Sequence, residues 1–327
     1  MKPKLLLTKI FQNEAFGSLQ RKEGIAKLSE IAELVDYDGD LTGDKADGVI
    51  GVIADSALVH REFYDSPDLR IVARWGVGYD KVQLPIANEL GVVVTVTPVH
   101  MDAVAEYTIA QWMATLKRTH TLNRMSHAGD FTIIRTYEAQ GSTFGLYGFG
   151  RIGQQVAMRA KPLLGESGRL LVYDVRPDID EVAARFGAEV ARDPHDLFHE
   201  SDTVSLHVSG DETIVDYTCF QTMKPHASLI NPSRGNLVDD NAARRAIDEE
   251  LITYYVVDDP VNGPREVHRD HPRIICTNHN GGITVESVRR LDTKTFEQVT
   301  DAIYGRQPEH VLNTEVLEHE RVRAWLS

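Results

Sequence analysis

One histidine near the end of the chain has the surroundings of a proton-transfer residue. His279 lies in the stretch TNHNGG, and the segment VVDDPVNGPREVH shortly before it carries several carboxylates. A histidine that exchanges a proton with a substrate usually has a carboxylate beside it, which fixes the tautomer and favours the protonated form. The sequence therefore raises the question of which carboxylate, if any, accompanies His279.

A glycine-rich turn in the middle of the chain has the spacing of a dinucleotide-binding motif. The sequence GFGRIG places glycines at Gly148, Gly150 and Gly153, after an apolar run and before a helix-like segment at 154–160 that precedes Pro162. In such motifs the first glycine makes a tight turn, the second lets the pyrophosphate approach the backbone, and the third lets helix and strand pack closely. The turn therefore predicts a dinucleotide site.

The residues that follow this turn indicate which dinucleotide it binds. Arg151 and Ile152 lie between the second and third glycines and are expected to contact the cofactor, and the free N–H groups at the start of the following helix would face the phosphates. Asp174 ends the next apolar run, LLVY, at the offset expected of an acid that binds the adenosine ribose. A carboxylate there would repel a 2′-phosphate, so NAD is favoured over NADP, although Arg176 could soften this preference.

Alternating strand-like and helix-like segments must position these residues. Short apolar runs rich in β-branched residues alternate with helical patterns, which is typical of parallel sheets covered on both faces. The runs are 4–7, 48–53, 70–75, 92–96, 144–147, 170–173, 204–208, 228–230, 254–257 and 274–276.

Two long helical patterns indicate how the chain passes between two domains. Residues 101–118 keep apolar side chains at helical spacing with no Gly or Pro, and they precede an irregular stretch at 126–141. We expect this helix to join an N-terminal α/β domain to a nucleotide domain, and the helix-like segment 285–303 to carry the chain back.

Composition limits the class of protein. A chain of 327 residues with 42% hydrophobic content suits about two globular domains, and a net charge of −14 disfavours nucleic-acid partners. The apolar run in the N-terminal segment MKPKLLLTKIFQ is only three leucines long, which is too short for the hydrophobic region of a signal peptide. No apolar run is long enough for a membrane span. We therefore expect a cytoplasmic protein. Cys219 and Cys276 lie far apart, so neither a disulfide scaffold nor a cysteine metal site is indicated.

Four motifs in order along the chain identify a family resemblance. They are RWGVGYDKV at 74–82, AVAEYT at 103–108, NPSRGNLVDD at 231–240 and TNHNGG at 277–282. Together with a glycine motif in mid-chain, they make this sequence similar to the D-isomer-specific 2-hydroxyacid dehydrogenases over nearly its whole length.

The resemblance implies an α/β fold of two doubly wound parallel-sheet domains. One is a discontinuous, flavodoxin-like substrate domain, at 1–98 and 288–327, and the other is a Rossmann NAD domain at 99–287. It also implies a cleft that closes on NAD and a small 2-keto or 2-hydroxy acid of D configuration. Hydride would pass between NAD(H) and that substrate.

The resemblance also implies substrate-binding residues. Arg234 would hold carboxylate and ketone oxygens in its planar fork and stabilise developing alkoxide charge, and His279 would be the acid or base. The N–H groups of Val77 and Gly78, after a strand, would bind the substrate carboxylate.

Further family positions imply contacts with the cofactor. His207 would lie near the cofactor, and Asp258 would contact the nicotinamide carboxamide. Thr108 and Thr213 are weaker candidates for polar contacts with it.

One family residue is absent. The family's glutamate that hydrogen-bonds the catalytic histidine falls five residues after the strand-end aspartate, where this chain has Gly263 before Pro264. Glu266 is the preferred substitute, because its Pro-flanked loop could fold back. Asp259 follows the cofactor-facing Asp258, so strand alternation would point it away.

The third possibility is that no acid accompanies the histidine. An unassisted histidine would still donate a proton, but reduction would weaken earlier as pH rises.

Other functions fit the same motifs. The chain could be an NAD-sensing regulatory protein of the corepressor type, or a dehydrogenase of a one-carbon or phosphorus oxyanion such as formate or phosphite. A symmetric homodimer is also expected, because the stretch HAGDFTIIRTY exposes Phe131, Ile133 and Ile134 beside the bridging helix.

Overall fold

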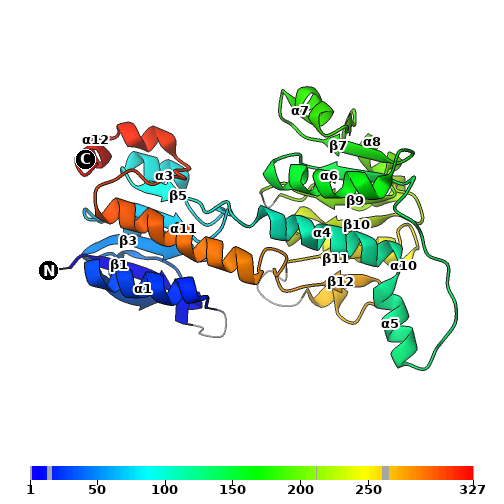
Figure 1. Cartoon of the computed structure of the whole chain (residues 1–327), viewed down its shortest axis with the longest axis horizontal. Coiled ribbons are helices and arrows are strands. Elements are labelled where there is room, and N and C mark those ends of the chain that lie inside the picture. Colours follow the sequence, from blue (N-terminus) through cyan, green and yellow to red (C-terminus); the bar gives the residue numbers. More distant parts are fainter. Residues whose placement is uncertain (1, 13–16, 211, 260–264, 327) are drawn as a thin grey trace. The chain divides into compact units, whose positions relative to one another are not determined.

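The chain folds into two compact α/β units. The computed structural model describes residues 2–12, 17–210, 212–259 and 265–326. Unit 1 comprises Met1–His100 and Thr284–Ser327, and unit 2 comprises Met101–Ile283 (Figure 1). The sequence had placed these divisions after residues 98 and 287.

Unit 1 contains a five-stranded parallel sheet in the order β2-β1-β3-β4-β5. This is the flavodoxin-like order. The strands are β1 Lys4–Thr8, β2 Glu33–Tyr37, β3 Val49–Ala54, β4 Ile71–Arg74 and β5 Val93–Thr95. The sequence did not predict β2, because this edge strand, ELVDY, has exposed charges and only its last residue is buried.

Helices cover this sheet, and α1 and α11 lie side by side over it (Figure 1). Helix α11 spans the predicted segment 285–303, and a capping box between Thr284 and Ser287 begins it. The helices of unit 1 are α1 Leu19–Ile31, α2 Arg61–Tyr64, α3 Leu84–Glu89, α11 Val285–Ile303 and α12 Glu320–Arg323, with 3₁₀ turns η1 Lys9–Gln12, η2 Gly43–Lys45 and η5 Thr314–Glu318.

A buried carboxylate joins α1, α11 and the end of β4. Asp292 has no exposed surface and accepts hydrogen bonds from Ser18 Oγ (2.7 Å), Trp75 Nε1 (2.9 Å) and two nitrogens of Arg21 (3.1 and 2.9 Å). The Arg21 guanidinium also lies 4.4 Å from the centre of the Phe11 ring. This cluster fixes Trp75, the residue that leads into the loop GVG.

Unit 2 contains a seven-stranded parallel sheet in the order β12-β11-β10-β9-β6-β7-β8. From β6 the chain adds β7 and β8 on one side, and from β9 it adds the remaining strands on the other side, which is the doubly wound dinucleotide-binding order. The predicted fold class is therefore confirmed for both units. The strands are β6 Thr143–Tyr147, β7 Arg169–Tyr173, β8 Glu189–Val190, β9 Thr203–Leu206, β10 Ser228–Asn231, β11 Tyr254–Val257 and β12 Ile274–Cys276. The two-residue edge strand β8 was not predicted.

The helices of unit 2 depart from the sequence prediction in two places. Helix α6 continues through Pro162 to Leu164, although the proline was expected to end it. Residues 119–127 form α5 before the expected irregular stretch. The helices are α4 Met101–Leu116, α5 Thr119–His127, α6 Arg151–Leu164, α7 Ile179–Arg185, α8 Pro194–Glu200, α9 Tyr217–Thr222 and α10 Asp240–Asp248, with 3₁₀ turns η3 Gly235–Leu237 and η4 Glu266–His268.

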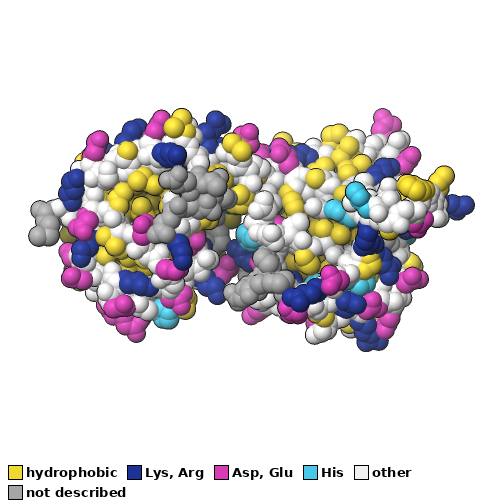
Figure 2. All heavy atoms as spheres, turned by 90° about the horizontal axis from the view of Figure 1, so that it is seen from below, with side chains coloured by type: hydrophobic (Ala, Val, Ile, Leu, Met, Phe, Trp, Pro, Cys, Tyr) yellow, Lys and Arg dark blue, Asp and Glu magenta, His cyan; other side chains and the backbone are white. Residues whose placement is uncertain are grey.

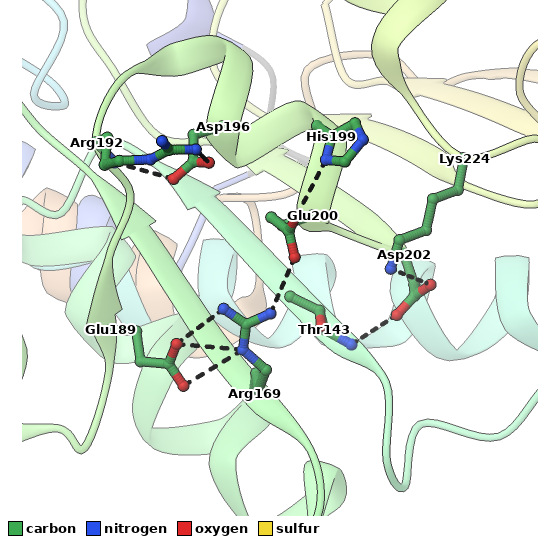
Figure 3. Close-up of polar contacts among 9 residues, drawn as sticks. All are labelled: Thr143, Arg169, Glu189, Arg192, Asp196, His199, Glu200, Asp202 and Lys224. Atoms are coloured by element: carbon green, nitrogen blue, oxygen red, sulfur yellow. Dashed lines mark hydrogen bonds and ion pairs between the residues drawn. The ribbon is translucent and has the colours of Figure 1, made fainter.

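Ion pairs and hydrogen bonds lie at the amino-terminal ends of strands β6, β7 and β8 (Figure 3). Arg169, at the start of β7, pairs with Glu189 at 2.8 Å and with Glu200 at 3.2 Å. Asp202 accepts from the backbone N–H of Thr143 and from Lys224. The glycine turn follows β6 at its opposite, carboxyl end, so these charges serve the sheet and not the site.

The molecular surface carries charges of both signs. On the face shown in Figure 2, basic and acidic side chains are interspersed over both parts of the chain. Among the described residues, no helix is both long enough and apolar enough to span a membrane.

Candidate active site

The glycine turn has the geometry of a pyrophosphate cradle. Gly148 has φ +94°, and a Cβ there would lie 2.5 Å from the carbonyl oxygen of His207. A Cβ at Gly153 would lie 2.4 Å from the Gly148 carbonyl oxygen, whereas one at Gly150 would meet nothing within 4 Å. Gly150 is the N-cap of α6 and supplies no side chain, so the first N–H groups of the helix remain open to an anion. The turn is tight at both ends and open in the middle.

Asp174 is fixed against this turn. Its carboxylate accepts from the backbone N–H of Phe149 at 2.6 Å and from that of Arg176 at 3.0 Å. Arg176 directs its guanidinium to Asp178, with contacts of 2.6 and 2.9 Å. Because this arginine already has a bidentate carboxylate partner, it offers less positive charge to a 2′-phosphate than the sequence suggested.

His207 is a neutral imidazole at the end of β9. Its Nε2 lies 2.9 Å from Ser205 Oγ, and its buried Nδ1 has no hydrogen-bond partner among the described residues. Burial lowers the pKa of His207 to about 3, so the ring is uncharged at neutral pH. An unpaired buried nitrogen beside the glycine turn fits a site that a polar ligand completes.

The two threonines expected at the cofactor differ in their surroundings. Thr108 has no exposed surface, and its hydroxyl donates to the Val104 carbonyl oxygen in its own helix, at 2.9 Å. This placement argues against a direct cofactor contact. Thr213 is exposed and donates to the carbonyl oxygen of Asn236 at 3.0 Å.

His279 lies in a strained turn that Asp258 holds. The histidine has φ +55°, in the left-handed region that few residues other than glycine adopt, and its side chain is 55% exposed. Asp258 is 3% exposed and accepts from the backbone N–H groups of Asn280 (2.9 Å) and Gly281 (2.6 Å) and from Thr277 Oγ1 (2.5 Å). Both of its oxygens thus serve the turn, a role that the sequence did not predict beside the expected carboxamide contact.

Sequence reasoning also missed the other end of this hydrogen-bond chain. The hydroxyl of Tyr107, on α4, lies 2.7 Å from Thr277 Oγ1. Burial raises the pKa of Tyr107, which keeps this hydroxyl protonated. Both residues fall inside motifs visible in the sequence, AVAEYT and TNHNGG, but only the tertiary structure brings the motifs together.

The carboxylate nearest His279 in the described structure is Asp259. Its Oδ1 lies 3.8 Å from His279 Nδ1, and the Asp259 side chain is 10% exposed. Glu266, the preferred substitute, is 74% exposed and pairs with Arg269 at 2.6 Å, so that preference is not met. The argument that Asp259 points away also fails, because β11 ends at Val257 and strand alternation does not extend to residue 259. Gly263 and Pro264 lie outside the described residues.

Arg234 lies in the turn after β10, close to the same carboxylate. The amide of Asn231 donates to the Arg234 carbonyl oxygen at 2.8 Å, and Arg234 Nη1 donates to the carbonyl oxygen of Ser233 at 2.9 Å. The next N–H, of Gly235, donates to Asp259 Oδ2 at 2.7 Å. Unit 2 thus brings Arg234, Asp259 and His279 together from three loops at the carboxyl ends of its strands.

In unit 1, the loop after β4 offers backbone donors. The carbonyl of Gly76 accepts from Thr97 N at 2.7 Å, and the carbonyl of Gly78 accepts from Arg74 Nε at 2.8 Å. No described residue accepts a hydrogen bond from the N–H of Val77 or Gly78. The carbonyl groups of Gly76 and Gly78 are thus hydrogen-bonded, whereas the N–H groups of Val77 and Gly78 have no acceptor among the described residues. Open N–H groups of this kind suit a carboxylate ligand.

Comparison with known proteins agrees with this geometry. Residues 109–281 match the model of the D-isomer specific 2-hydroxyacid dehydrogenase family, NAD binding domain. The chain belongs to this family. It is therefore an NAD-dependent oxidoreductase of 2-hydroxy acids.

Relatives extend the similarity over most of the chain. A glyoxylate reductase of Aeropyrum pernix is 31% identical over 270 residues, which cover 77% of this chain and 79% of the relative. One from Thermococcus litoralis is 30% identical over 289 residues, covering 84% and 85%. The crystal structure of a glyoxylate reductase from Paecilomyes thermophila has a TM-score of 0.81 at 19% identity, over 96% of this chain and 99% of that one, which supports the fold.

Proposed function

We propose that this protein reduces a small 2-keto acid, with glyoxylate as the first candidate, to the corresponding 2-hydroxy acid. The observation that carries this proposal is the grouping of Arg234, His279 and a buried carboxylate in the unit that holds the glycine turn. The curated relatives named as glyoxylate reductases support the choice of substrate.

The residues of the glycine turn fit NAD. Gly148, Gly150 and Gly153, with the N–H groups of Arg151 and Ile152, would hold the pyrophosphate, and Asp174 would bind the adenosine ribose. His207 would lie at the edge of this site, with an Nδ1 atom that has no hydrogen-bond partner in the described part of the chain. When bound, the nicotinamide supplies the hydride, and the protein supplies position and electrostatics.

The proposal gives each unit its own ligand groups. In unit 1, the N–H groups of Val77 and Gly78 would bind a carboxylate. In unit 2, the Arg234 guanidinium would bind a ketone oxygen in a fixed fork. Imidazolium at His279 donates a proton to that oxygen as the carbonyl is reduced, and Arg234 stabilises the charge that develops there.

A direct assay tests the activity. NADH absorbance is followed with glyoxylate, pyruvate, hydroxypyruvate, formate and phosphite, the last two with NAD. We expect oxidation of NADH with one or more keto acids. Turnover of formate or phosphite alone would replace the keto-acid proposal, and NAD binding without any turnover would favour the regulatory alternative.

Variants test the residue roles. His279→Ala and Arg234→Ala should each lower kcat/KM by roughly 100-fold or more, on the scale of general acid catalysis and electrostatic stabilisation. Arg269→Ala is the matched control, because this arginine is 55% exposed and pairs with Glu266. Activity that survives both of the first two changes would overturn the assignment of the site.

Assembly as a homodimer is also part of the proposal. The segment after α5 exposes Phe131 (78%) and Ile133 (96%), which a partner surface would cover. Light scattering should give a dimer mass for the wild type and a monomer mass for Phe131→Asp/Ile133→Asp. A monomeric wild type at micromolar concentration would refute it. Cytoplasmic localisation likewise remains a proposal, and cell fractionation tests it.

A further inference from the structure

Asp259 joins the two residues proposed to act on the ketone. Its side chain is 10% exposed, and its two oxygens have different neighbours: Oδ2 accepts from Gly235 N at 2.7 Å, and Oδ1 lies 3.8 Å from His279 Nδ1. Arg265 approaches its main-chain carbonyl, with Nη1 at 3.4 Å. The carboxylate is therefore anchored on one side and faces the imidazole on the other.

We propose that Asp259 is the positioning residue for His279, in place of the glutamate that the family carries at the position of Gly263. This inference rests on the proposed function of His279 as the proton donor. The Oδ1 atom accepts the Nδ1 proton of the imidazole, so that Nε2 is the nitrogen that exchanges a proton with substrate. The separation of Oδ1 and Nδ1, 3.8 Å, would shorten to hydrogen-bond length when substrate binds, as catalytic hydrogen bonds often do.

The anchor to Gly235 is what makes this arrangement specific. Because Oδ2 is held by the N–H that directly follows Arg234, one carboxylate fixes both the backbone of the arginine and the ring of the histidine. The alternative acid cannot do this in the described structure, since Glu266 is exposed and paired with Arg269. Asp258 is also unavailable, because its oxygens hold the turn at 277–281.

An isosteric substitution separates positioning from packing. In Asp259→Asn the amide keeps the shape of the side chain, and its single carbonyl oxygen can still accept from Gly235 N. Its NH₂ group would then face His279 Nδ1 and favour the wrong neutral tautomer, with the proton on Nε2. We expect kcat to fall by about 100-fold or more while KM changes by less than about threefold, because proton donation is lost and substrate binding is kept.

The matched control is Glu266→Gln, which removes the exposed acid from the same loop. It should leave kcat and KM at their wild-type values. Loss of kcat in Glu266→Gln equal to that in Asp259→Asn, or wild-type kcat in Asp259→Asn, would overturn the proposal.

A spectroscopic measurement decides the question without catalysis. Long-range ¹H–¹⁵N correlation spectra of the full chain, with His279 assigned by comparison with His279→Gln, report which ring nitrogen carries the proton of the neutral imidazole. Wild-type protein should show the Nδ1–H tautomer, and Asp259→Asn should show a larger Nε2–H population. A wild-type Nε2–H tautomer would refute the role of Asp259 even if the variant failed to fold. If no keto acid is turned over, the proposed function fails separately, because the tautomer is read in the absence of substrate.

Discussion

Removal of the buried Asp292 carboxylate should strongly destabilise unit 1. In Asp292→Ala, the Arg21 guanidinium, which is 2% exposed, would lose both of its hydrogen bonds to this carboxylate. Ser18 and the Trp75 indole would lose the same partner. The change removes the carboxylate that pairs with this buried cation and leaves a cavity beside it.

The expected magnitude follows from burial. Breaking a buried ion pair by removing one partner costs about 3 to 5 kcal/mol, most of it the penalty of the charge that remains. Glu89→Ala is the matched control in the same unit, because Glu89 also forms a two-bond contact with an arginine, Arg61, but both side chains are largely exposed. Its removal should leave the free energy of unfolding nearly unchanged.

Hydrogen–deuterium exchange in urea measures this for each unit separately. Peptides from α1 and α11 report on unit 1, and peptides from α6, in unit 2, are the internal reference. Asp292→Ala should lower the stability of the α1 and α11 peptides and leave that of α6 unchanged. A loss of less than about 1 kcal/mol in the unfolding free energy of unit 1 in Asp292→Ala would refute the reasoning about burial, and so would an equal loss in Glu89→Ala.

Three further predictions concern the cofactor site. Gly150→Ala should weaken NAD binding at least about tenfold, because the added methyl group would occupy the space through which the pyrophosphate approaches the backbone. The free energy of unfolding should stay unchanged, because φ is −73° at this position and no atom lies within 4 Å of the added group. Calorimetric titration and urea unfolding test this, and an NAD affinity equal to that of the wild type would contradict it. Asp174→Ser should improve NADP binding relative to NAD by about tenfold, because a like charge is removed; unchanged selectivity in fluorescence titrations would contradict the ribose assignment. For His207, the folded-state pKa of about 3 lies below the unfolded value of about 6.5, so the unfolded chain binds more protons and stability falls as pH drops below about 6.5. The Tm of His207→Gln should therefore fall less than that of the wild type between about pH 7 and pH 5. An equal fall in thermal scans would show that His207 does not contribute to the pH dependence of stability.

Much of the fold could be read from local sequence because the strands are buried on both faces. Runs such as YYVV at β11 and VIGVIA at β3 are continuously apolar, which is the pattern of central parallel strands. The edge strands β2 and β8 carry charged or partly exposed residues and lack this signal. Pro162 did not end α6, because packing of the helix on the sheet outweighed the local preference.

The sequence by itself predicted the glycine turn, its acid and the roles proposed for Arg234 and His279, because these predictions depend on residue type and spacing within short segments. Only the tertiary structure decided which carboxylate lies beside His279. That distance depends on where the chain turns after β11, and the backbone N–H of Gly235, from another loop, holds Asp259 in place. The same holds for Tyr107 and Asp292, whose partners lie 170 and up to 274 residues away along the chain. Contacts of that separation arise from packing of whole elements, and no local pattern encodes them.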